Sequence, residues 1–239
     1  MNNLYDVFII GGGINGCGVA RDAAGRGYSV YLAEKSDIAS GTSSASSKLI
    51  HGGLRYLENY EFSLVRASLR ERDILIKIAP HIIKEMRFIL PYHKNLRPVW
   101  LLKMGMLLYD NLYSSKHIKR SSYIKIPFHE SKSTLTESFN KGFEYSDCIT
   151  DDARLTVLNA ADAKRLGGDI NTRTIVKNME QKKGVWNIEV MNTISNETKY
   201  VQAKVVVNAT GPWVDNFLKS HSKQTKFDNI RLVKGSHIV

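Results

Sequence analysis

The sequence has few of the residues that mark specialised classes of protein. It contains two cysteines and five prolines among 239 residues. Cys17 and Cys148 lie far apart and in no metal-ligand spacing, which argues against a disulfide framework or a structural zinc and is typical of a reducing compartment. We therefore expect no metal site. The chain is 43% hydrophobic, too apolar for a disordered protein, and its low proline content excludes a collagen-like one.

Long hydrophobic runs are also absent. The first apolar run covers only residues 7–10, and no basic segment precedes it, so the N-terminus does not have the form of a signal peptide. No stretch reaches the ~18 uncharged apolar residues that a membrane-spanning helix needs. We expect a soluble or peripheral protein.

Acidic residues are outnumbered, since 23 Asp and Glu stand against 34 Lys and Arg, a formal net charge of +11. Residues 84–141 hold eleven basic and four acidic residues, a local excess of seven. Such a stretch can meet nucleic acid, anionic lipid or a phosphorylated substrate, or form a plain solvated surface. No zinc-finger or aromatic nucleic-acid-binding pattern accompanies it, so we expect no nucleic-acid partner.

The first forty residues predict a βαβ unit. A short apolar run, Val7–Ile10, is stopped by three glycines, as expected of a buried parallel strand. Residues 14–26 are rich in Ala and Gly and predict a helix that packs closely on a sheet. Residues 29–33 predict a second strand, and Glu34 follows it. The crossover of such a unit is right-handed in nearly all proteins.

The turn of this unit carries the pattern GxGxxG over residues 11–16. Gly11 allows the tight turn, Gly13 lets the backbone approach a diphosphate, and Gly16 lets the helix pack on the strand. The free N–H groups of the helix can hold the diphosphate, and Glu34 can accept hydrogen bonds from ribose hydroxyls. The pattern predicts dinucleotide binding; the alternative is a tight βα turn without a ligand.

The loop after the acidic residue helps to choose between nicotinamide and flavin cofactors. Residues 42–47 (TSSASS) offer hydroxyl and amide donors to the flavin side of a diphosphate. Together with the position of the glycine turn near the N-terminus, this favours FAD. The alternative is a flexible serine linker.

The rest of the chain alternates helical and strand patterns. We expect helices over residues 54–78, 97–113 and 152–166, and strands over 86–90, 143–146, 171–176, 185–191, 200–203, 205–207 and 230–239. Residues 114–141 predict no regular structure. The apolar face of the first helix is expected at Leu64, Ala67, Ser68, Leu75 and Ile78. The stripe Trp100, Met104, Leu107 and Leu108 of the second helix fits either a core or a membrane surface.

Two long runs resemble one family. Residues 10–27 resemble the first signature of the FAD-dependent, aerobic-type glycerol-3-phosphate dehydrogenases, and residues 42–62 (TSSASSKLIHGGLRYLENYEF) resemble the flavin loop of that family. Further matches cover residues 96–98, 142–148, 151–155, 208–213 and 231–239.

The resemblance implies that bound FAD oxidises sn-glycerol 3-phosphate to dihydroxyacetone phosphate and that the electrons pass to quinone at a membrane surface. It places the protein in the cytoplasm, or docked on the inner face of the cell membrane. The residues that the motifs and the resemblance assign to FAD are Gly11, Gly13, Ile14, Asn15, Gly16, Glu34, Thr42, Ser43, Ser46, Ser47, Leu49, Ala209, Thr210 and Gly211.

The same resemblance gives candidates for the substrate side. A dianionic phosphate needs basic donors, and oxidation of a hydroxyl group needs a base. Arg55 is the candidate contact to the substrate, with Tyr56 beside it. His51 and His237 are the candidates to hydrogen-bond the reacting hydroxyl or the flavin. Alternatives stay open: His51 buried against backbone, Arg55 paired with Glu58, and His237 facing solvent.

The expected architecture is an α/β, FAD-binding Rossmann-like domain of the glutathione-reductase or D-amino-acid-oxidase type. It takes residues 1–78 and 146–212, and an inserted α+β cap takes 79–145 and 213–239. The family is about twice as long, so we expect an N-terminal half, truncated at the C-terminus, that is active only if a second polypeptide supplies the remainder. The alternatives are a non-catalytic remnant or FAD-binding module, and a related amine or amino-acid oxidase, which residues 46–57 disfavour.

Overall fold

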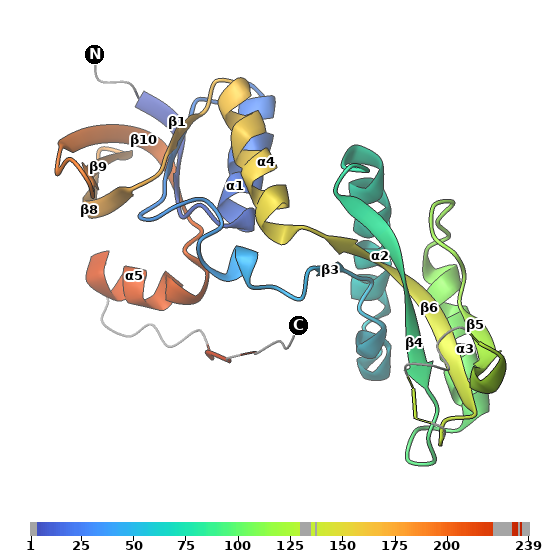
Figure 1. Ribbon diagram of the computed structural model, residues 1–239. Helices are drawn as coiled ribbons and strands as arrows, with labels where there is room; N and C mark the ends of the chain where they lie inside the picture. The colour runs from blue at the N-terminus through green and yellow to red at the C-terminus, as the bar shows by residue number, and fades with distance from the viewer. Residues whose placement is uncertain (1–3, 130–134, 137, 222–230, 234, 236–239) are drawn as a thin grey trace. The chain divides into compact units, whose positions relative to one another are not determined.

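The computed structural model describes residues 4–129, 135–136, 138–221, 231–233 and 235. The chain divides into two compact units. Figure 1 colours the ribbon by residue number, so the segments of each unit can be followed with its colour bar. Unit 1 consists of Met1–Ser47 and Asp152–Val239, and unit 2 of Lys48–Asp151. The predicted boundaries, at 78/79, 145/146 and 212/213, differ from these. Residues 48–78 and 146–151 group with unit 2, and residues 213–239 with unit 1.

A six-stranded sheet with the order β7-β2-β1-β10-β9-β8 forms the centre of unit 1. Its strands are β1 (Leu4–Ile10), β2 (Val30–Ala33), β7 (Asp169–Asn171), β8 (Thr174–Lys182), β9 (Val185–Asn192) and β10 (Thr198–Asn208). The first four in the sheet order run parallel, and β9 and β8 extend the sheet as antiparallel strands. The predicted βαβ unit is confirmed, and the two strands predicted over 200–207 form one strand, β10.

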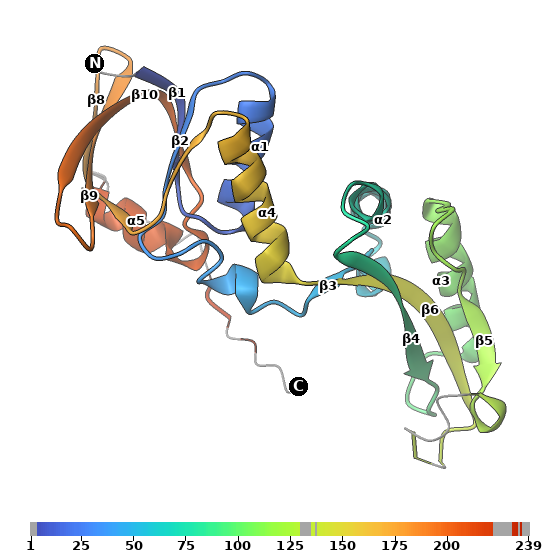
Figure 2. The same cartoon turned by 45° about the horizontal axis from the view of Figure 1, so that its top comes forward.

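Helices cover one face of this sheet because the residues of its central strands alternate between the two faces. Ile9 of β1 packs with Ala20 and Ala24 of α1 (Ile14–Gly25) and with Ala163 of α4 (Asp152–Arg165). Small side chains at these contacts let both helices lie close to the strands. Figure 2 shows α1 and α4 side by side. Phe8 points to the opposite face, where apolar residues of β8, β9 and β10 surround it.

The remaining elements of unit 1 are short. They are the 3-10 helices η1 (Thr42–Ser44) and η5 (Gly211–Trp213) and the helix α5 (Val214–His221). Of the strand predicted over residues 230–239, only residues 231–233 and 235 are described, and they have no regular secondary structure.

Among its described residues, unit 2 has an antiparallel sheet, two α-helices and two 3-10 helices. Its strands are β3 (Leu49–Ile50), β4 (Ile83–Pro91), β5 (Ser122–Lys125) and β6 (Lys141–Thr150), and its helices are η2 (Leu54–Asn59), α2 (Phe62–Ile78), α3 (Val99–Leu112) and η3 (Ile126–Phe128). β6 pairs with all three other strands. The prediction of no regular structure over 114–141 is wrong, because β5 lies there and gains its hydrogen bonds from β6.

Two further predictions in unit 2 need correction. The helix predicted over 54–78 is two elements, η2 and α2, separated by a left-handed residue at Tyr60 (φ +60°). The predicted apolar face of α2 is also wrong, because Leu64 and Ile78 are 43% and 69% exposed. The face of α2 that the unit buries carries Val65, Leu69, Arg72 and Asp73.

The stripe on α3 is exposed and does not form a core. Trp100, Met104 and Leu107 are each about three-fifths exposed in the structure, whereas Met106 and Tyr109 of the same helix are buried. No helix in the described part of the chain has the length and apolar content that crossing a bilayer requires.

Candidate functional site

The carboxyl ends of three parallel strands meet at one edge of the unit 1 sheet. The backbone bonds continue past the strands to this edge: Gly11 N donates to Ala33 O at 2.9 Å, and Ala209 N donates to Ile10 O at 2.9 Å. The glycine turn, Glu34 and residues 208–211 therefore lie next to one another. Ligands of open α/β sheets bind outside the carboxyl ends of the strands.

Two glycines of the turn are required by close contacts between backbone segments. Gly11 has φ +108°, and a Cβ atom there would lie 2.6 Å from Ala209 O. A Cβ atom at Gly16 would lie 2.0 Å from Gly11 O. Both positions exclude any side chain. Glycine is therefore required here because the first turn of α1 packs directly on the end of β1 and on the segment after β10.

The N-terminus of α1 has free donors for an anion. Its N-cap residue is Gly13, which has no side chain to accept from the first amides. Ile14 N donates to Ser43 Oγ at 2.9 Å, a hydroxyl that η1 brings from 29 residues further along the chain. No acceptor in the described residues is bonded to the amides of Asn15 and Gly16. These amides and the helix dipole favour a diphosphate, and the Ser43 hydroxyl can donate to it.

Glu34 is held in place by two backbone amides. Its Oε2 accepts from Gly12 N at 2.6 Å, and its Oε1 accepts from Ser36 N at 2.7 Å. Each carboxylate oxygen keeps a further lone pair, which can accept a ribose hydroxyl. The side chain is therefore oriented before any ligand arrives.

The segment after β10 closes the other side of this edge. Asn208 Oδ1 accepts from Thr210 N at 3.2 Å and from Thr210 Oγ1 at 2.7 Å. Asn208 Nδ2 is buried without an acceptor among the described residues. Next, η5 brings the ring of Trp213 against Gly41, where a Cβ atom would lie 3.2 Å from the ring. The serine loop and residues 208–213 thus lie together.

Three predicted cofactor residues have other surroundings. Ser46 N and Oγ both donate to Asp152 Oδ2, at 3.1 and 2.7 Å, which ties the end of the serine loop to the start of α4. Ser47 is exposed at the end of unit 1's first segment. Leu49 belongs to unit 2, where it pairs with Ile149 of β6. Roles for these residues at FAD stay predictions.

The predicted substrate residues that the structure describes lie on one short stretch of unit 2. His51 follows β3, and Arg55 and Tyr56 lie on η2; all three are exposed. The alternative of a buried His51 is therefore wrong for this structure. Glu58 Oε1 pairs with Arg97 Nε at 3.5 Å, and the ion pairs of the described residues include none between Glu58 and Arg55. His237 lies outside the described residues.

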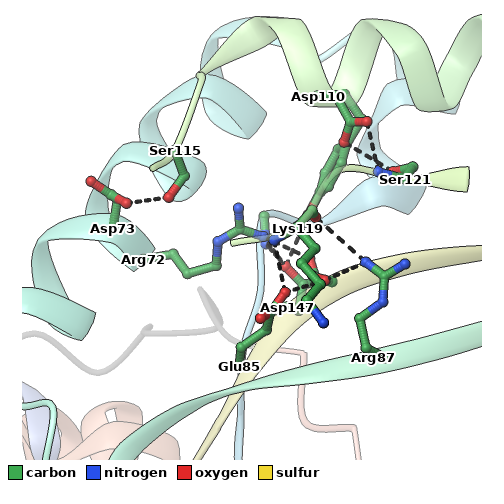
Figure 3. A network of polar contacts seen from close by, with 12 residues as sticks. Arg72, Asp73, Glu85, Arg87, Asp110, Ser115, Lys119, Ser121 and Asp147 are labelled. Carbon is green, nitrogen blue, oxygen red and sulfur yellow. Dashed lines mark hydrogen bonds and ion pairs between the residues drawn. The ribbon is translucent and has the colours of Figure 1, made fainter. Parts of the chain in front are cut away.

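Unit 2 contains a buried polar cluster that was not predicted from the sequence (Figure 3). Arg72 Nη1 donates to Asp147 Oδ1 at 2.5 Å and to Ser146 O at 3.0 Å, and both charged side chains are almost fully buried. Beside them, Arg87 Nη2 donates to Glu144 Oε2 at 2.5 Å. The signal was present in α2, because Arg72 continues the helical spacing of the buried Val65 and Leu69.

A small cleft opens beside this cluster between α2, α3 and the segment that follows α3. Its lining includes Arg72, Tyr109, Tyr113, Lys119 and Arg120. Lys119 N donates to Glu85 Oε1 at 2.8 Å, and Arg120 Nη2 donates to Asn111 Oδ1 at 2.9 Å. These bonds tie the segment after α3 to β4 and α3. Basic residues that line the cleft therefore already have partners within unit 2.

The strand, glycine turn, helix, strand and acidic residue of unit 1 define a dinucleotide-binding fold. The sequence matches the family of FAD dependent oxidoreductases over residues 6–239. The chain belongs to this family, and the predicted family and fold class are confirmed.

Individual relatives are more specific. The chain is 50% identical over 234 residues to D-erythritol 1-phosphate dehydrogenase of Brucella abortus (strain 2308), which covers 98% of this chain and 47% of that protein. It is 48% identical to glycerol-3-phosphate dehydrogenase of Pseudomonas aeruginosa, over 99% of this chain and 45% of that protein. It is 47% identical to aerobic glycerol-3-phosphate dehydrogenase of Escherichia coli (strain K12), over 98% and 46%. The chain thus spans less than half the length of these relatives.

Solved structures show the same fold. Glycerol-3-phosphate dehydrogenase from Bacillus halodurans, complexed with FAD, matches with a TM-score of 0.64 and 29% identity, over 91% of this chain and 36% of that chain. Glycine oxidase from Geobacillus kaustophilus matches with a TM-score of 0.71 and 19% identity, over 90% and 58%. At 19% identity, the similarity to glycine oxidase concerns the fold alone.

The edge of the unit 1 sheet fits the adenosine diphosphate part of FAD, the cofactor of this family. Backbone contacts at Gly11 and Gly16 hold the first turn of α1 against β1 and Ala209, and the amides of Asn15 and Gly16 have no acceptor among the described residues. Glu34 has an oriented carboxylate with lone pairs to spare. The donor set is that of a diphosphate and a ribose, which agrees with the family.

Proposed function

We propose that this chain is the FAD-binding part of a dehydrogenase that oxidises the phosphate monoester of a short polyol. The first candidate reaction converts sn-glycerol 3-phosphate to dihydroxyacetone phosphate. The observation that carries it is the 47–48% identity, over nearly the whole chain, to the glycerol-3-phosphate dehydrogenases of two organisms. The glycine turn and the oriented Glu34 support the cofactor.

A second candidate substrate is D-erythritol 1-phosphate. A relative named for that substrate is 50% identical to the chain, as similar as the glycerol-3-phosphate dehydrogenases. The two substrates share a phosphate monoester and neighbouring hydroxyl groups and differ by one CHOH unit. A pocket that offers no hydrogen-bond partner to the extra hydroxyl group discriminates between them by only about 10–200-fold, so the same residues can serve either.

Three exposed residues of unit 2, called here the substrate residues, carry the substrate side of the proposal: His51, Arg55 and Tyr56. Arg55 would bind the phosphate through charge-assisted hydrogen bonds, and Tyr56 would add a hydroxyl donor beside it. His51 would take the proton of the hydroxyl that is oxidised. His237 is a second candidate for this proton. When bound, FAD supplies the acceptor for the hydride of the substrate carbon.

Partners of the whole enzyme belong to the same proposal. We infer that quinone accepts the electrons, that a second polypeptide or segment supplies the part the relatives have beyond this chain, and that the enzyme works in the cytoplasm at the inner face of the membrane. The exposed apolar stripe Trp100, Met104 and Leu107, with Lys103 beside it, supports docking on an anionic bilayer. Trp100→Glu should then reduce binding to anionic vesicles, measured by co-sedimentation, whereas equal binding would argue against this face.

The reaction is tested with the purified chain in three steps. First, the absorption spectrum after addition of FAD and gel filtration reports cofactor binding. Second, dye reduction is measured with sn-glycerol 3-phosphate, D-erythritol 1-phosphate and, as a control, glycerol. Third, both measurements are repeated with the polypeptide that corresponds to the remaining part of the relatives.

We expect FAD binding by the chain, no dye reduction by the chain alone, and reduction with a phosphorylated polyol once the remaining part is present. The ratio of kcat/KM for the two phosphorylated substrates identifies the natural one. Equal rates with glycerol and the phosphate esters would contradict the role of Arg55. Turnover by the chain alone would show that no second segment is needed.

A further inference from the structure

The turn between β3 and η2 is held from behind by a buried acceptor. Gly52 N donates to Tyr109 Oη and to Asp147 Oδ1, each at 3.1 Å. The same Asp147 oxygen accepts the Tyr109 hydroxyl at 3.0 Å and Arg72 Nη1 at 2.5 Å. One carboxylate oxygen therefore joins α2, α3, β6 and the backbone of the turn, at the cluster shown in Figure 3.

The stability of unit 2 does not explain this arrangement. Arg72 and Asp147 are both 4% exposed, and taking such a pair out of water costs much of what its attraction gains. Arg72 Nε is in addition buried without a partner among the described residues, which is a further cost. Apolar side chains of the same size would fill the space with no such cost. The polar pair instead fixes the direction of the Gly52 amide, which donates to Asp147 Oδ1.

The backbone of the turn has little freedom to move away from the cluster. A Cβ atom at Gly52 would lie 2.3 Å from Leu69 Cδ2 and 2.4 Å from Tyr109 Oη, so the main chain itself rests on α2 and α3. Gly53 then adopts φ +72°, a conformation that favours glycine, and starts η2. The position of the Gly52 peptide therefore sets the direction in which η2 leaves.

Apolar contacts of η2 fix which of its residues face outward. With three residues per turn, Leu54 and Leu57 share one side of η2, and both pack against the apolar cluster of α2 and α3. Arg55 and Tyr56 lie between them and are exposed. The inner side of η2 is thus fixed by polar bonds at Gly52 and by apolar contacts one turn later.

We propose that Arg72, Asp147 and Tyr109 are positioning residues for the substrate side of the enzyme: they hold the Gly52 peptide and thereby aim the substrate residues on either side of it. None of the three has to touch the substrate. This inference rests on the proposed function, since it concerns how the substrate residues are held.

The Tyr109 phenol keeps its proton over the usable pH range. Burial, with the Asp147 carboxylate as the second cause, raises the pKa of the Tyr109 phenol far above its ordinary value. Tyr109 therefore remains a hydroxyl that donates to Asp147 and accepts from Gly52. A loss of positioning is expected only when one of the bonds is removed.

The test compares two substitutions that each remove one phenolic hydroxyl. Tyr109→Phe deletes the bonds to Gly52 and Asp147. Tyr113→Phe is the matched control, because the Tyr113 hydroxyl donates to a different carboxylate, Asp73 Oδ2, at 3.4 Å. The first measurement is hydrogen exchange of the Gly52 amide by NMR on the isotope-labelled full chain without ligand. We expect exchange to be at least tenfold faster in Tyr109→Phe and unchanged in the control.

The second measurement is steady-state kinetics with the chain supplemented by the polypeptide that completes it. We expect kcat/KM for the preferred phosphorylated polyol to fall at least tenfold in Tyr109→Phe, with FAD content and melting temperature equal to those of Tyr113→Phe.

Two results would overturn the inference: unchanged exchange at Gly52 in Tyr109→Phe, or faster exchange with kcat/KM equal to that of the control. Failure of the proposed function has a different signature, because the unsubstituted protein would then oxidise neither phosphorylated polyol. In that case the exchange rate at Gly52 alone decides whether the cluster holds the turn.

Discussion

Replacement of Gly16 by alanine tests how closely α1 approaches β1. The added Cβ atom would lie 2.0 Å from Gly11 O and 3.1 Å from Gly11 C. Ordinary contact begins at 3.4 Å, so the helix or the turn must move by about 1.4 Å, the difference between 3.4 and 2.0 Å. Both partners are backbone and cannot rotate away, as a side chain could.

The expected cost follows from two opposing terms. Overpacking of a close contact costs about 1–3 kcal/mol and sometimes more, and a backbone clash belongs at the upper end. Alanine gains about 1 kcal/mol over glycine in a helix interior. The net loss for Gly16→Ala is therefore about 2 kcal/mol in the free energy of unfolding of unit 1, a large share of the ~5–15 kcal/mol of an ordinary domain.

Gly18→Ala provides the matched control on the same helix. A Cβ atom at Gly18 would meet no other atom within 4 Å, so only the gain in helix propensity remains. We expect this variant to be more stable than the parent by up to about 1 kcal/mol. The two variants should therefore differ by about 3 kcal/mol although they make the same chemical change two residues apart.

Urea unfolding of fluorotryptophan-labelled protein, followed by ¹⁹F NMR, can assign the loss to one unit. Trp186 and Trp213 lie in unit 1 and Trp100 in unit 2. The midpoint of the unit 1 signals should fall by about 1 M in Gly16→Ala, from a slope of about 1–3 kcal/mol per M, and FAD affinity should fall at least tenfold. If Gly16→Ala and Gly18→Ala unfold at the same urea concentration, the close approach of α1 to the backbone of Gly11 does not limit the stability of unit 1.

Three further predictions concern unit 1. Glu34→Gln should weaken FAD binding about tenfold, because a neutral amide accepts ribose hydroxyls less strongly than a carboxylate; fluorescence titration with unchanged affinity would contradict this. The pKa of Asp6 is lowered from 3.8 to about 2, first by the hydrogen bond from Lys204 and then by Ser29. Its folded pKa lies below the unfolded one, so its contribution to stability is present above pH 4 and is lost as the pH falls through about 2. Lys204→Ala should raise the Asp6 pKa toward 3.8 in an NMR titration. An Asp6 pKa that is the same in the variant and the parent would contradict the pairing of Asp6 with Lys204. Burial, followed by the Glu34 carboxylate, raises the pKa of the Cys17 thiol to about 12, so Ellman's reagent should react with Cys17 at least ~100-fold more slowly in folded than in urea-unfolded protein at pH 8; equal rates would show that the thiol is accessible.

The dinucleotide-binding half of the fold was predictable because its signals are local. A buried strand shows as an apolar run, and its stop at three glycines marks a turn that only glycine can make. Glu34 was found by its place at the end of the second strand. Each signal depends on residues close together in the sequence, and the structure places them as the pattern predicts.

The serine loop was predictable in composition and not in detail. Its composition indicated hydroxyl donors near the diphosphate, but only the fold brings Ser43 to Ile14 N. The fold also directs Ser46 to Asp152, 106 residues away, and groups Leu49 with unit 2. Contacts across such distances depend on how elements pack, which no local pattern encodes.

The buried face of α2 shows why hydrophobic periodicity failed in unit 2. The helix has apolar residues on more than one side, and the prediction chose the side of Leu64 and Ile78. The structure buries the side with Arg72, because Asp147 lies 75 residues further along the chain and compensates its charge. A charged residue in a helix is read as exposed unless its partner is known.

By itself the sequence determined the glycine turn, the acidic acceptor, the FAD-binding fold and the family, since the steric demands of a glycine turn and the period of buried strands act over a few residues. Only the tertiary structure decided which face of α2 and α3 is buried, which donors gather at the end of α1, and what lies behind the substrate residues. The physical reason is that burial of a polar group is favourable only when a distant partner compensates it. The Gly52 peptide, Tyr109 and Asp147 meet for that reason, and no spacing in the sequence predicts it.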